Sequence, residues 1–274
     1  MRPASSIALA ALATLSIACG PDPEGLAVLD DDIALGQLHL AGAQALHLPA
    51  LQGQAGLEAL LDVIVVARLL VQGDGAAAAA GFAKTPRIVN LDPKTIFDVF
   101  DDLLKVGEAV DMKSQSEHAM VALRARYWEA VDFVNPYASQ EEILFLEWAD
   151  PAFVGGHWTP GLIEAAGGRH SLNQEGKPSR QVAAEDLIEV LPDRVIVCPC
   201  GFDLERSAAE IEVLEGTPWW PLLPAVQEGK IAIVDGSAMF NRPGPRLVDA
   251  FRWLVAWLQD RPEVLPEDFP VRFG

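Results

Sequence analysis

Residues Glu141–Trp158, EEILFLEWADPAFVGGHW, are the stretch that decides the fold of this chain. Four consecutive apolar residues, Ile143–Leu146, are followed shortly by the breaker pair Asp150-Pro151. A short apolar run bounded by turn residues predicts a buried strand of a parallel sheet, which we expect over residues 143–147.

The segment after this strand predicts a long loop and then a helix. Aromatic and small residues fill the loop, and Thr159-Pro160 follows them. Threonine favours the N-cap and proline the first helical position, so we expect a helix over residues 160–166 capped by Thr159. In α/β proteins, loops at the carboxyl ends of parallel strands bind ligands. Trp148 and Trp158 give this loop amphipathic surface suited to a ligand, although packing alone also accounts for them.

Strand-like and helix-like segments alternate along most of the remaining chain. Such alternation predicts a parallel sheet covered by helices on both faces. We expect strands over residues 62–66, 87–91, 194–198 and 230–234, and helices over residues 95–107, 114–133, 184–190, 203–214 and 245–258. The proline-rich tail, residues 262–274, is expected to lie on the surface.

The predicted fold class is α/β, with two Rossmann-like lobes of parallel sheet joined by one long α-helix. The pair Asn135-Pro136 ends that helix, because the residue before a proline disfavours helical backbone. The predicted divisions are a leader at residues 1–19, a first lobe at 20–112, a linking helix at 113–135 and a second lobe at 136–274.

The chain is strongly acidic, which argues against one class of partner. It has 39 acidic and 20 basic residues and a formal net charge of -19. Binding the phosphates of nucleic acid needs a positive field, so no nucleic-acid partner is expected. High solubility is the simplest consequence of this charge.

The first residues resemble a bacterial secretory leader. A short positive start precedes the apolar run Ile7–Ala18, which is too short to span a bilayer. The run ends at Ala18-Cys19, an arrangement that resembles a lipoprotein signal. We therefore expect lipidation of Cys19 and a location in the periplasm or on the outer face of the cell membrane, with the anchor as the membrane contact. A cytoplasmic location is the alternative.

The two remaining cysteines, Cys198 and Cys200, flank Pro199. Their spacing does not suit an unstrained disulfide, and closed metal sites usually need a second pair of ligands. Buried packing is the expected role, and a metal site that adds His157 is the alternative. The sequence contains none of the common hydrolase, metalloprotease or nucleotide-binding motifs, so we expect no enzyme, no catalytic residues and no cofactor.

Three later segments resemble a single family in combination. They read LEWADPAFVGGHWTPGLIEAAGG from Leu146, DRVIVCPCGFDLER from Asp193 and FNRPGPRLVDAF from Phe240. Together with RIVNLDPKTIFDVFDDLLKVGEAV from Arg87, they are similar to the cobalamin-type substrate-binding proteins of bacterial ABC importers. The resemblance covers residues 86–260.

This resemblance implies a binding protein that clamps its ligand between two α/β lobes and works with the permease of an ABC transporter. Cobalamin, another corrinoid or a similar metal chelate is the implied ligand. The family's Ser-Ala-Thr-Glu-like turn is missing between Gly20 and Leu60, and its Cys-rich loop is missing after Val66, so the first lobe is expected to be reduced. The alternatives are a metal-dependent enzyme or metal receptor on a related fold, and a family member that has lost ligand binding.

Loops after three of the predicted strands should bring the candidate ligand residues to one edge of the sheet. Aromatic rings bordered by polar groups suit a large flat ligand with a polar rim. The predicted ligand-binding residues are Trp148, Trp158, Phe202, Phe240, Asn241 and Arg242. For Arg242, anchoring its own loop is an equally good interpretation.

Overall fold

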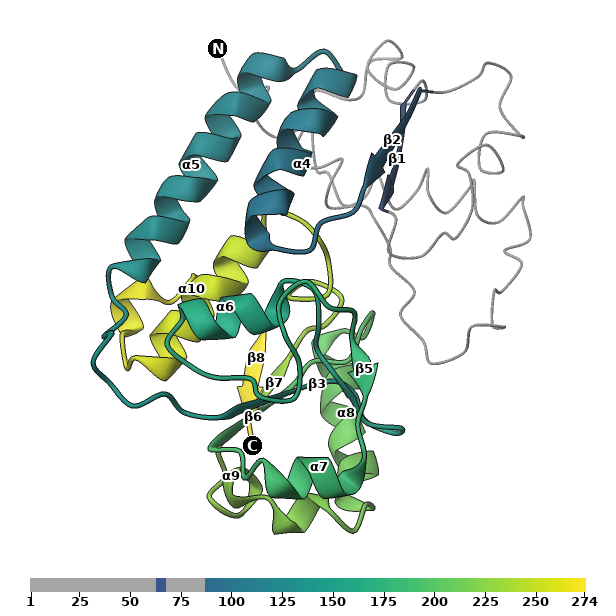
Figure 1. Cartoon of the computed structure of the whole chain (residues 1–274), viewed down its shortest axis with the longest axis vertical. Helices are drawn as coiled ribbons and strands as arrows, with labels where there is room; N and C mark the ends of the chain where they lie inside the picture. Colours follow the sequence, from purple (N-terminus) through teal and green to yellow (C-terminus); the bar gives the residue numbers. More distant parts are fainter. Residues whose placement is uncertain (1–62, 68–86) are drawn as a thin grey trace, which may run out of the picture. The chain divides into compact units, whose positions relative to one another are not determined.

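The computed structural model describes residues 63–67 and 87–274, which fall into two compact units. The first unit includes Phe100–Val121 together with the described residues up to Asp92, and the second includes Pro93–Val99 and Ala122–Gly274. Helices α4 (Ile96–Ala109) and α5 (Lys113–Val131) each have residues in both units, so the chain passes from one unit to the other within each helix (Figure 1).

In the first unit, strands β1 (Val63–Ala67) and β2 (Arg87–Leu91) pair in parallel, as the sequence predicts for an α/β fold. Helices α4 and α5 approach each other closely at Gly107. A β-carbon at Gly107 would lie only 2.2 Å from the β-carbon of Ser116, so this crossing requires glycine.

The predicted cap of helix α4 at Thr95 is confirmed. The Thr95 hydroxyl accepts a hydrogen bond from the Asp98 N–H (3.2 Å), and the Asp98 carboxylate accepts one from the Thr95 N–H (2.8 Å). This reciprocal arrangement satisfies two backbone donors that a helix N-terminus otherwise leaves without partners.

The second unit is built on a six-stranded sheet in the order β5-β4-β3-β6-β7-β8. The central strands β3, β6 and β7 are parallel, whereas β4, β5 and β8 join antiparallel. The expectation of a parallel sheet is therefore confirmed for the centre and wrong for the edges. The bounds are β3 Ile143–Trp148, β4 Phe153–Val154, β5 Arg180–Gln181, β6 Arg194–Val197, β7 Ile231–Val234 and β8 Val271–Phe273.

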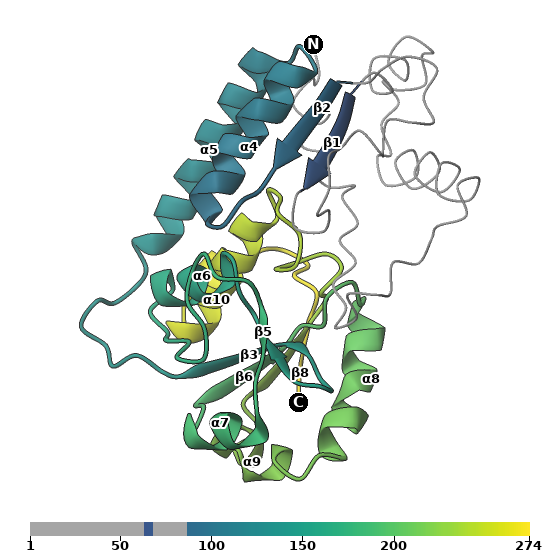
Figure 2. The ribbon, with the colours of Figure 1, turned by 45° about the vertical axis from the view of Figure 1, so that its right-hand side comes forward.

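Alternate residues of β3 face opposite sides of the sheet, and each side is covered by its own helices. Leu144 and Leu146 belong to the core shared with α7, α8 and η3, whereas the ring of Phe145 faces the side of α10 through contact with Phe240. Figure 2 shows α6 and α10 on one side of the sheet and α7 and α9 on the other. The bounds are α6 Thr159–Ala165, α7 Ala184–Glu189, α8 Leu204–Glu215, η3 Trp220–Leu222, α9 Pro224–Gln227, α10 Leu247–Leu258 and η4 Pro262–Val264.

Helix α6 starts one residue earlier than expected. Its N-cap residue is Trp158, which makes no side-chain capping bond, and Thr159 is the first helical residue. The predicted capping role of Thr159 is wrong because its buried side chain lies against the backbone of Gly155 instead.

The C-terminal tail lies on the surface, as expected, since most of its residues are exposed, but it is also part of the fold. Strand β8 extends the sheet beside β7, and Val264 in η4 is buried. The ring of Phe269 stacks on Trp253 of α10, with centroids 5.0 Å apart and an interplanar angle of 4°. The tail thus covers apolar surface on α10 that would otherwise face water.

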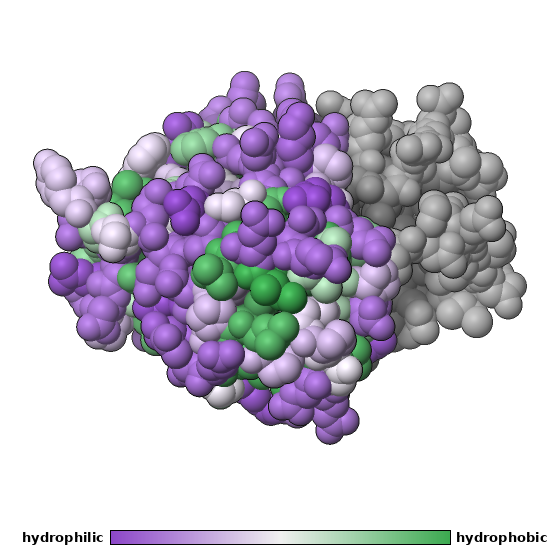
Figure 3. All heavy atoms as spheres, turned by 60° about the horizontal axis from the view of Figure 1, so that its bottom comes forward, coloured by the Kyte–Doolittle hydropathy of each residue, from purple (hydrophilic) through white to green (hydrophobic). Residues whose placement is uncertain are grey.

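The end of the second unit formed by α7, η3 and α9 has an apolar surface. Figure 3 looks at this end of the molecule and shows an apolar patch surrounded by hydrophilic residues. Leu191, which follows α7, is 60% exposed, and Leu222 of η3 is 53% exposed.

Candidate functional site

The loops that follow β3, β6 and β7 meet at the carboxyl edge of the parallel strands, as predicted. The Cys200 N–H donates to the Glu147 carbonyl (3.1 Å), which joins the first two loops. The Ser237 N–H donates to the Phe202 carbonyl (2.8 Å), which joins the second and third. The three loops therefore form one continuous surface in the second unit.

Trp148 and the buried Phe202 form an aromatic pair within these loops. Their rings make an edge-to-face contact with centroids 5.1 Å apart. Trp148 is half-buried, and the guanidinium carbon of the exposed Arg206 lies 3.5 Å from the centre of the Phe202 ring. The result is a row of three flat groups, one of them cationic, and cations favour the face of an aromatic ring.

Arg206 was not among the residues predicted for the site. It lies in the first turn of α8, where the side chain of Asp203 caps the helix by accepting from the Arg206 N–H (2.9 Å). The cap turns the chain at Phe202 and brings the arginine back over the ring. In the sequence, Arg206 follows the predicted residue Phe202 by one helical turn, and this spacing was the signal that could have identified it.

Trp158 and Phe240 come together in the interior. Both are buried, and the indole N–H of Trp158 donates to the Phe240 carbonyl (2.6 Å). The Phe240 ring also contacts Phe145 of β3 and Trp253 of α10. This hydrogen bond joins the first loop to the third. Contact of either residue with a ligand stays a prediction.

Asn241 is buried, and its side chain links the third loop to the second. Its amide donates to the carbonyl of Cys198 (2.8 Å). Arg242 is half-buried and donates to the Ser237 hydroxyl (3.2 Å) within its own loop, the anchoring role considered above. Burial and then the nearby Arg246 lower the pKa of Arg242 from its usual value. The roles of Asn241 and Arg242 toward a ligand stay predictions.

Cys198 and Cys200 are both buried, as expected, and neither forms a disulfide within the described residues. Burial, followed by the charges of Glu147 and Asp235, raises the pKa of Cys198, so its thiol is not disposed to ionise. Among residues 63–67 and 87–274, no group of three His, Cys, Asp or Glu side chains is arranged to hold a metal ion. The alternative metal site of His157 with both cysteines is therefore wrong.

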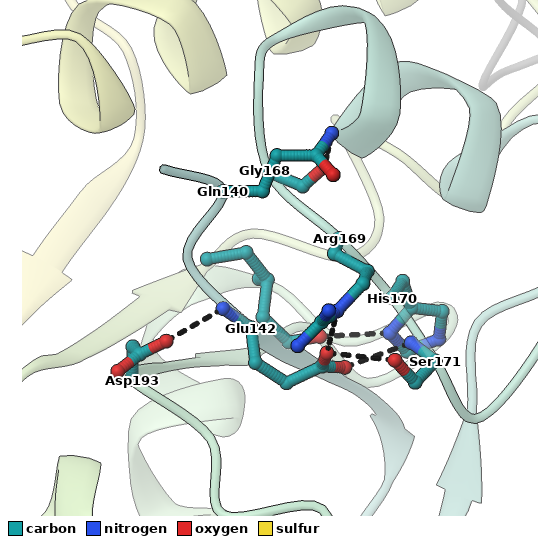
Figure 4. A network of polar contacts seen from close by, with 8 residues as sticks. Gln140, Glu142, Gly168, Arg169, His170, Ser171 and Asp193 are labelled. Carbon is teal, nitrogen blue, oxygen red and sulfur yellow. Dashed lines mark hydrogen bonds and ion pairs between the residues drawn. The ribbon is translucent and has the colours of Figure 1, made fainter. Parts of the chain in front are cut away.

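A second polar feature lies near the start of β3 (Figure 4). The buried carboxylate of Glu142 accepts hydrogen bonds from Arg169 Nε (2.6 Å), the Ser171 N–H (2.8 Å) and the Ser171 hydroxyl (2.7 Å). The Glu142 N–H donates to the Asp193 carboxylate (2.7 Å). These residues are not among those predicted from the sequence, because no motif joins partners so far apart along the chain.

Two predictions fall on residues outside the described part of the chain. These are the lipidation of Cys19 and the reduction of the first lobe, most of which belongs to residues 20–62 and 68–86. The domain boundaries stay predictions. None of the described helices is both long and apolar enough to cross a membrane.

Comparison with known proteins identifies similar folds but no sequence relatives. No protein-family model matches the chain, and no curated protein does. A periplasmic heme-binding protein from Pseudomonas aeruginosa is 18% identical, with a TM-score of 0.61 and 76% of each chain covered. The periplasmic vitamin B12-binding protein of Vibrio cholerae is also 18% identical, with a TM-score of 0.56 and coverage of 75% of this chain and 78% of that one.

A third similar structure is named for transport in general. It is an ABC transporter substrate-binding protein from Listeria monocytogenes, 16% identical, with a TM-score of 0.62 and coverage of 75% of this chain and 81% of that one. All three similar structures are named as binding proteins. The α/β fold and the predicted resemblance are therefore confirmed: the chain has the fold of the two-lobed periplasmic binding proteins of the heme, vitamin B12 and iron class.

Proposed function

We propose that this protein is the substrate-binding protein of an ABC importer and that it carries a flat metal chelate, either a corrinoid such as cobalamin or a heme. The single observation that supports this best is the half-buried ring of Trp148 against Phe202, at the carboxyl ends of two parallel strands. The similar folds named for heme and vitamin B12 binding also support it.

The chemistry of this surface suits such a ligand. A planar macrocycle gains from contact with aromatic rings, each contact contributing about 0.5–1.5 kcal/mol beyond the area it buries. Arg206, stacked on Phe202, adds a positive charge beside the rings for the polar rim of the chelate. The role is binding and delivery, with an ABC permease as the protein partner and no chemical step.

Tryptophan fluorescence tests this function, because corrinoids and hemes absorb in the range of indole emission. Titration of the purified protein with cobalamin, and separately with heme, should give saturable quenching with one of them. Trp148→Ala should weaken that binding by about fivefold or more, since it removes one aromatic contact together with its buried area.

Trp128→Ala is the matched control. Trp128 is a 48% exposed tryptophan on α5 and belongs to none of the three loops that follow β3, β6 and β7, so its loss should leave the affinity unchanged. Absence of saturable quenching with both ligands would contradict the proposal and favour a protein that has lost ligand binding. Equal weakening by both variants would contradict the assignment of Trp148.

A further inference from the structure

Two exposed leucines belong to neighbouring loops at the end of the second unit formed by α7, η3 and α9. Leu191 follows α7, and the carbonyl of the next residue, Pro192, accepts from the Ala225 N–H of α9 (3.2 Å). Leu222 lies in η3, three residues before Ala225. The hydrogen bond therefore joins the two loops, at the end of the molecule where Figure 3 shows an apolar patch.

Leu191 adopts a left-handed backbone conformation, with a φ of 47°, that its residue type disfavours. It directly follows Val190, the C-cap of α7, a position where left-handed backbone commonly ends a helix and glycine is preferred. Its place before Pro192 favours extended backbone instead. Helix termination explains the conformation but not the leucine, and packing does not explain it either, because the residue is 60% exposed.

Leu222 is held on a rigid part of the chain. Pro221 precedes it, and Pro224 begins α9 two residues later. The Gln227 side-chain amide donates to the Pro221 carbonyl (2.9 Å), and the neighbouring Trp220 is buried in the core. Two prolines and these contacts restrict the loop, so a partner that covers Leu222 would lose little free energy in ordering it.

The segments that carry the two leucines are acidic. Residues 183–193 and 207–229 contain eight acidic residues and no lysine or arginine. The acidic residues are Glu185, Asp186, Glu189, Asp193, Glu210, Glu212, Glu215 and Glu228, all of them exposed except the half-buried Glu210. Lys230, the next basic residue after these segments, forms an ion pair with Glu228 (2.8 Å). The exposed leucines therefore lie in a field of negative charge.

This charge decides between the possible occupants of the surface. A second copy would bring the same acidic segments against these, and like charges oppose association. The chain's own residues 1–62 and 68–86 contain eight acidic residues and only three basic ones, so they do not complement the surface either. An anionic membrane is disfavoured for the same reason. A partner with basic residues beside an apolar face matches both the leucines and the charge.

We propose that Leu191 and Leu222 form a docking surface for a basic amphipathic segment of a partner protein. The apolar face of that segment would cover the two leucines, and its lysines and arginines would face the surrounding carboxylates, as in recognition of an amphipathic helix. Both leucines lie outside the three loops of the candidate ligand site. The inference is therefore independent of the proposed transport function.

Fluorescence anisotropy of labelled model peptides with the purified full chain tests the proposal. One peptide carries leucines at helical spacing with lysines elsewhere, and the other has glutamate in place of every lysine. We expect saturable binding of the lysine peptide that weakens as salt is added, and binding of the glutamate peptide at least about tenfold weaker. Leu222→Ala and Leu191→Gly should each weaken binding of the lysine peptide by about fivefold or more.

Leu265→Ala is the matched control for peptide binding. Leu265 is a 47% exposed leucine of the same unit that follows η4, outside the proposed surface, so its truncation should leave the affinity unchanged. Equal weakening by Leu265→Ala and Leu222→Ala, or equal binding of the two peptides, would overturn the proposal.

Thermal unfolding of Leu191→Gly separates docking from packing. Glycine suits the left-handed conformation at this position, so the variant should unfold at the same temperature as the wild type or a higher one while it loses peptide binding. A lower unfolding temperature would show that Leu191 stabilises the fold itself and would overturn its role in docking.

Two further measurements test the other occupants. In sedimentation velocity the wild type should be a monomer, and a dimer that Leu222→Ala dissociates would assign the surface to a second copy. In the Leu222→Cys variant the new thiol should react with a thiol reagent at the rate of an exposed cysteine. A much slower reaction in the monomer would mean that the chain's own residues cover the surface. Either result would overturn the proposal of a basic partner.

Discussion

Two tryptophans of one loop differ in what they do because they differ in exposure. Trp148 keeps part of its ring at the surface against Phe202, whereas Trp158 is 3% exposed and donates its indole N–H to the Phe240 carbonyl. A buried indole donor needs a partner, and here the partner belongs to another loop. The same residue type therefore serves as a candidate ligand contact in one place and as a loop link in the other.

Trp158→Phe tests the second role. The change removes the donor, leaves the Phe240 carbonyl buried without that partner and reduces the packed volume, so the free energy of unfolding should fall by about 1–3 kcal/mol. Urea denaturation of the purified protein measures the loss. Trp128→Phe, on the exposed face of α5, is the control and should change stability by less than about 0.5 kcal/mol. Equal effects in both variants would show that the indole bond is not important for stability.

At the scale of elements, the C-terminal tail shows how short strands escape sequence patterns. Strand β8 has only three residues, and β4 and β5 have two each. No alternation of apolar and polar residues can appear over such lengths, whereas β3, with four apolar residues in a row, was recognisable. Contacts with existing strands and helices, rather than local preference, determine where these edge strands form.

The tail should contribute to the stability of the second unit through Phe269. Phe269→Ala removes the ring stacked on Trp253 and should lower the free energy of unfolding by about 1–3 kcal/mol, because both the stacking and the buried area are lost. Thermal and urea denaturation measure the change.

The control for this prediction is Phe273→Ala. Phe273 lies in β8 itself but is 61% exposed, so its truncation should have a much smaller effect. A Phe269→Ala variant as stable as the wild type would mean that the tail is held by its strand pairing alone.

At the scale of the whole molecule, the proposed role requires a location outside the cytoplasm. We expect Cys19 to carry a lipid that anchors the mature chain, given the positive start and the apolar run before Ala18-Cys19. In cell fractionation, the wild type should sediment with membranes and Cys19→Ala should not. A matched Cys200→Ala variant should behave like the wild type. A wild-type protein found wholly in the cytosol would contradict both the anchor and the location.

The class of the fold and its long elements could be predicted from patterns of neighbouring residues. Apolar runs gave the central strands, and breaker residues gave the ends of the helices, because these signals are local and strong. The strand pattern also predicted that Trp148 and Phe202 lie at the same edge of the sheet, since the carboxyl ends of parallel strands lie together. Their rings are in contact in the structure. The resemblance to binding proteins depended on these same loops, and the fold confirms it.

Which of the candidate residues face the interior could not be predicted, because it depends on contacts made in the folded chain. Trp158, Phe240 and Asn241 read like Trp148 in the sequence, but contacts with strands and loops far away in the chain bury them. The edge strands and the hydrogen bond between His170 and the Ile143 carbonyl likewise depend on partners that are distant along the chain. Burial is a property of the assembled layers, and a pattern of neighbouring residues cannot specify it.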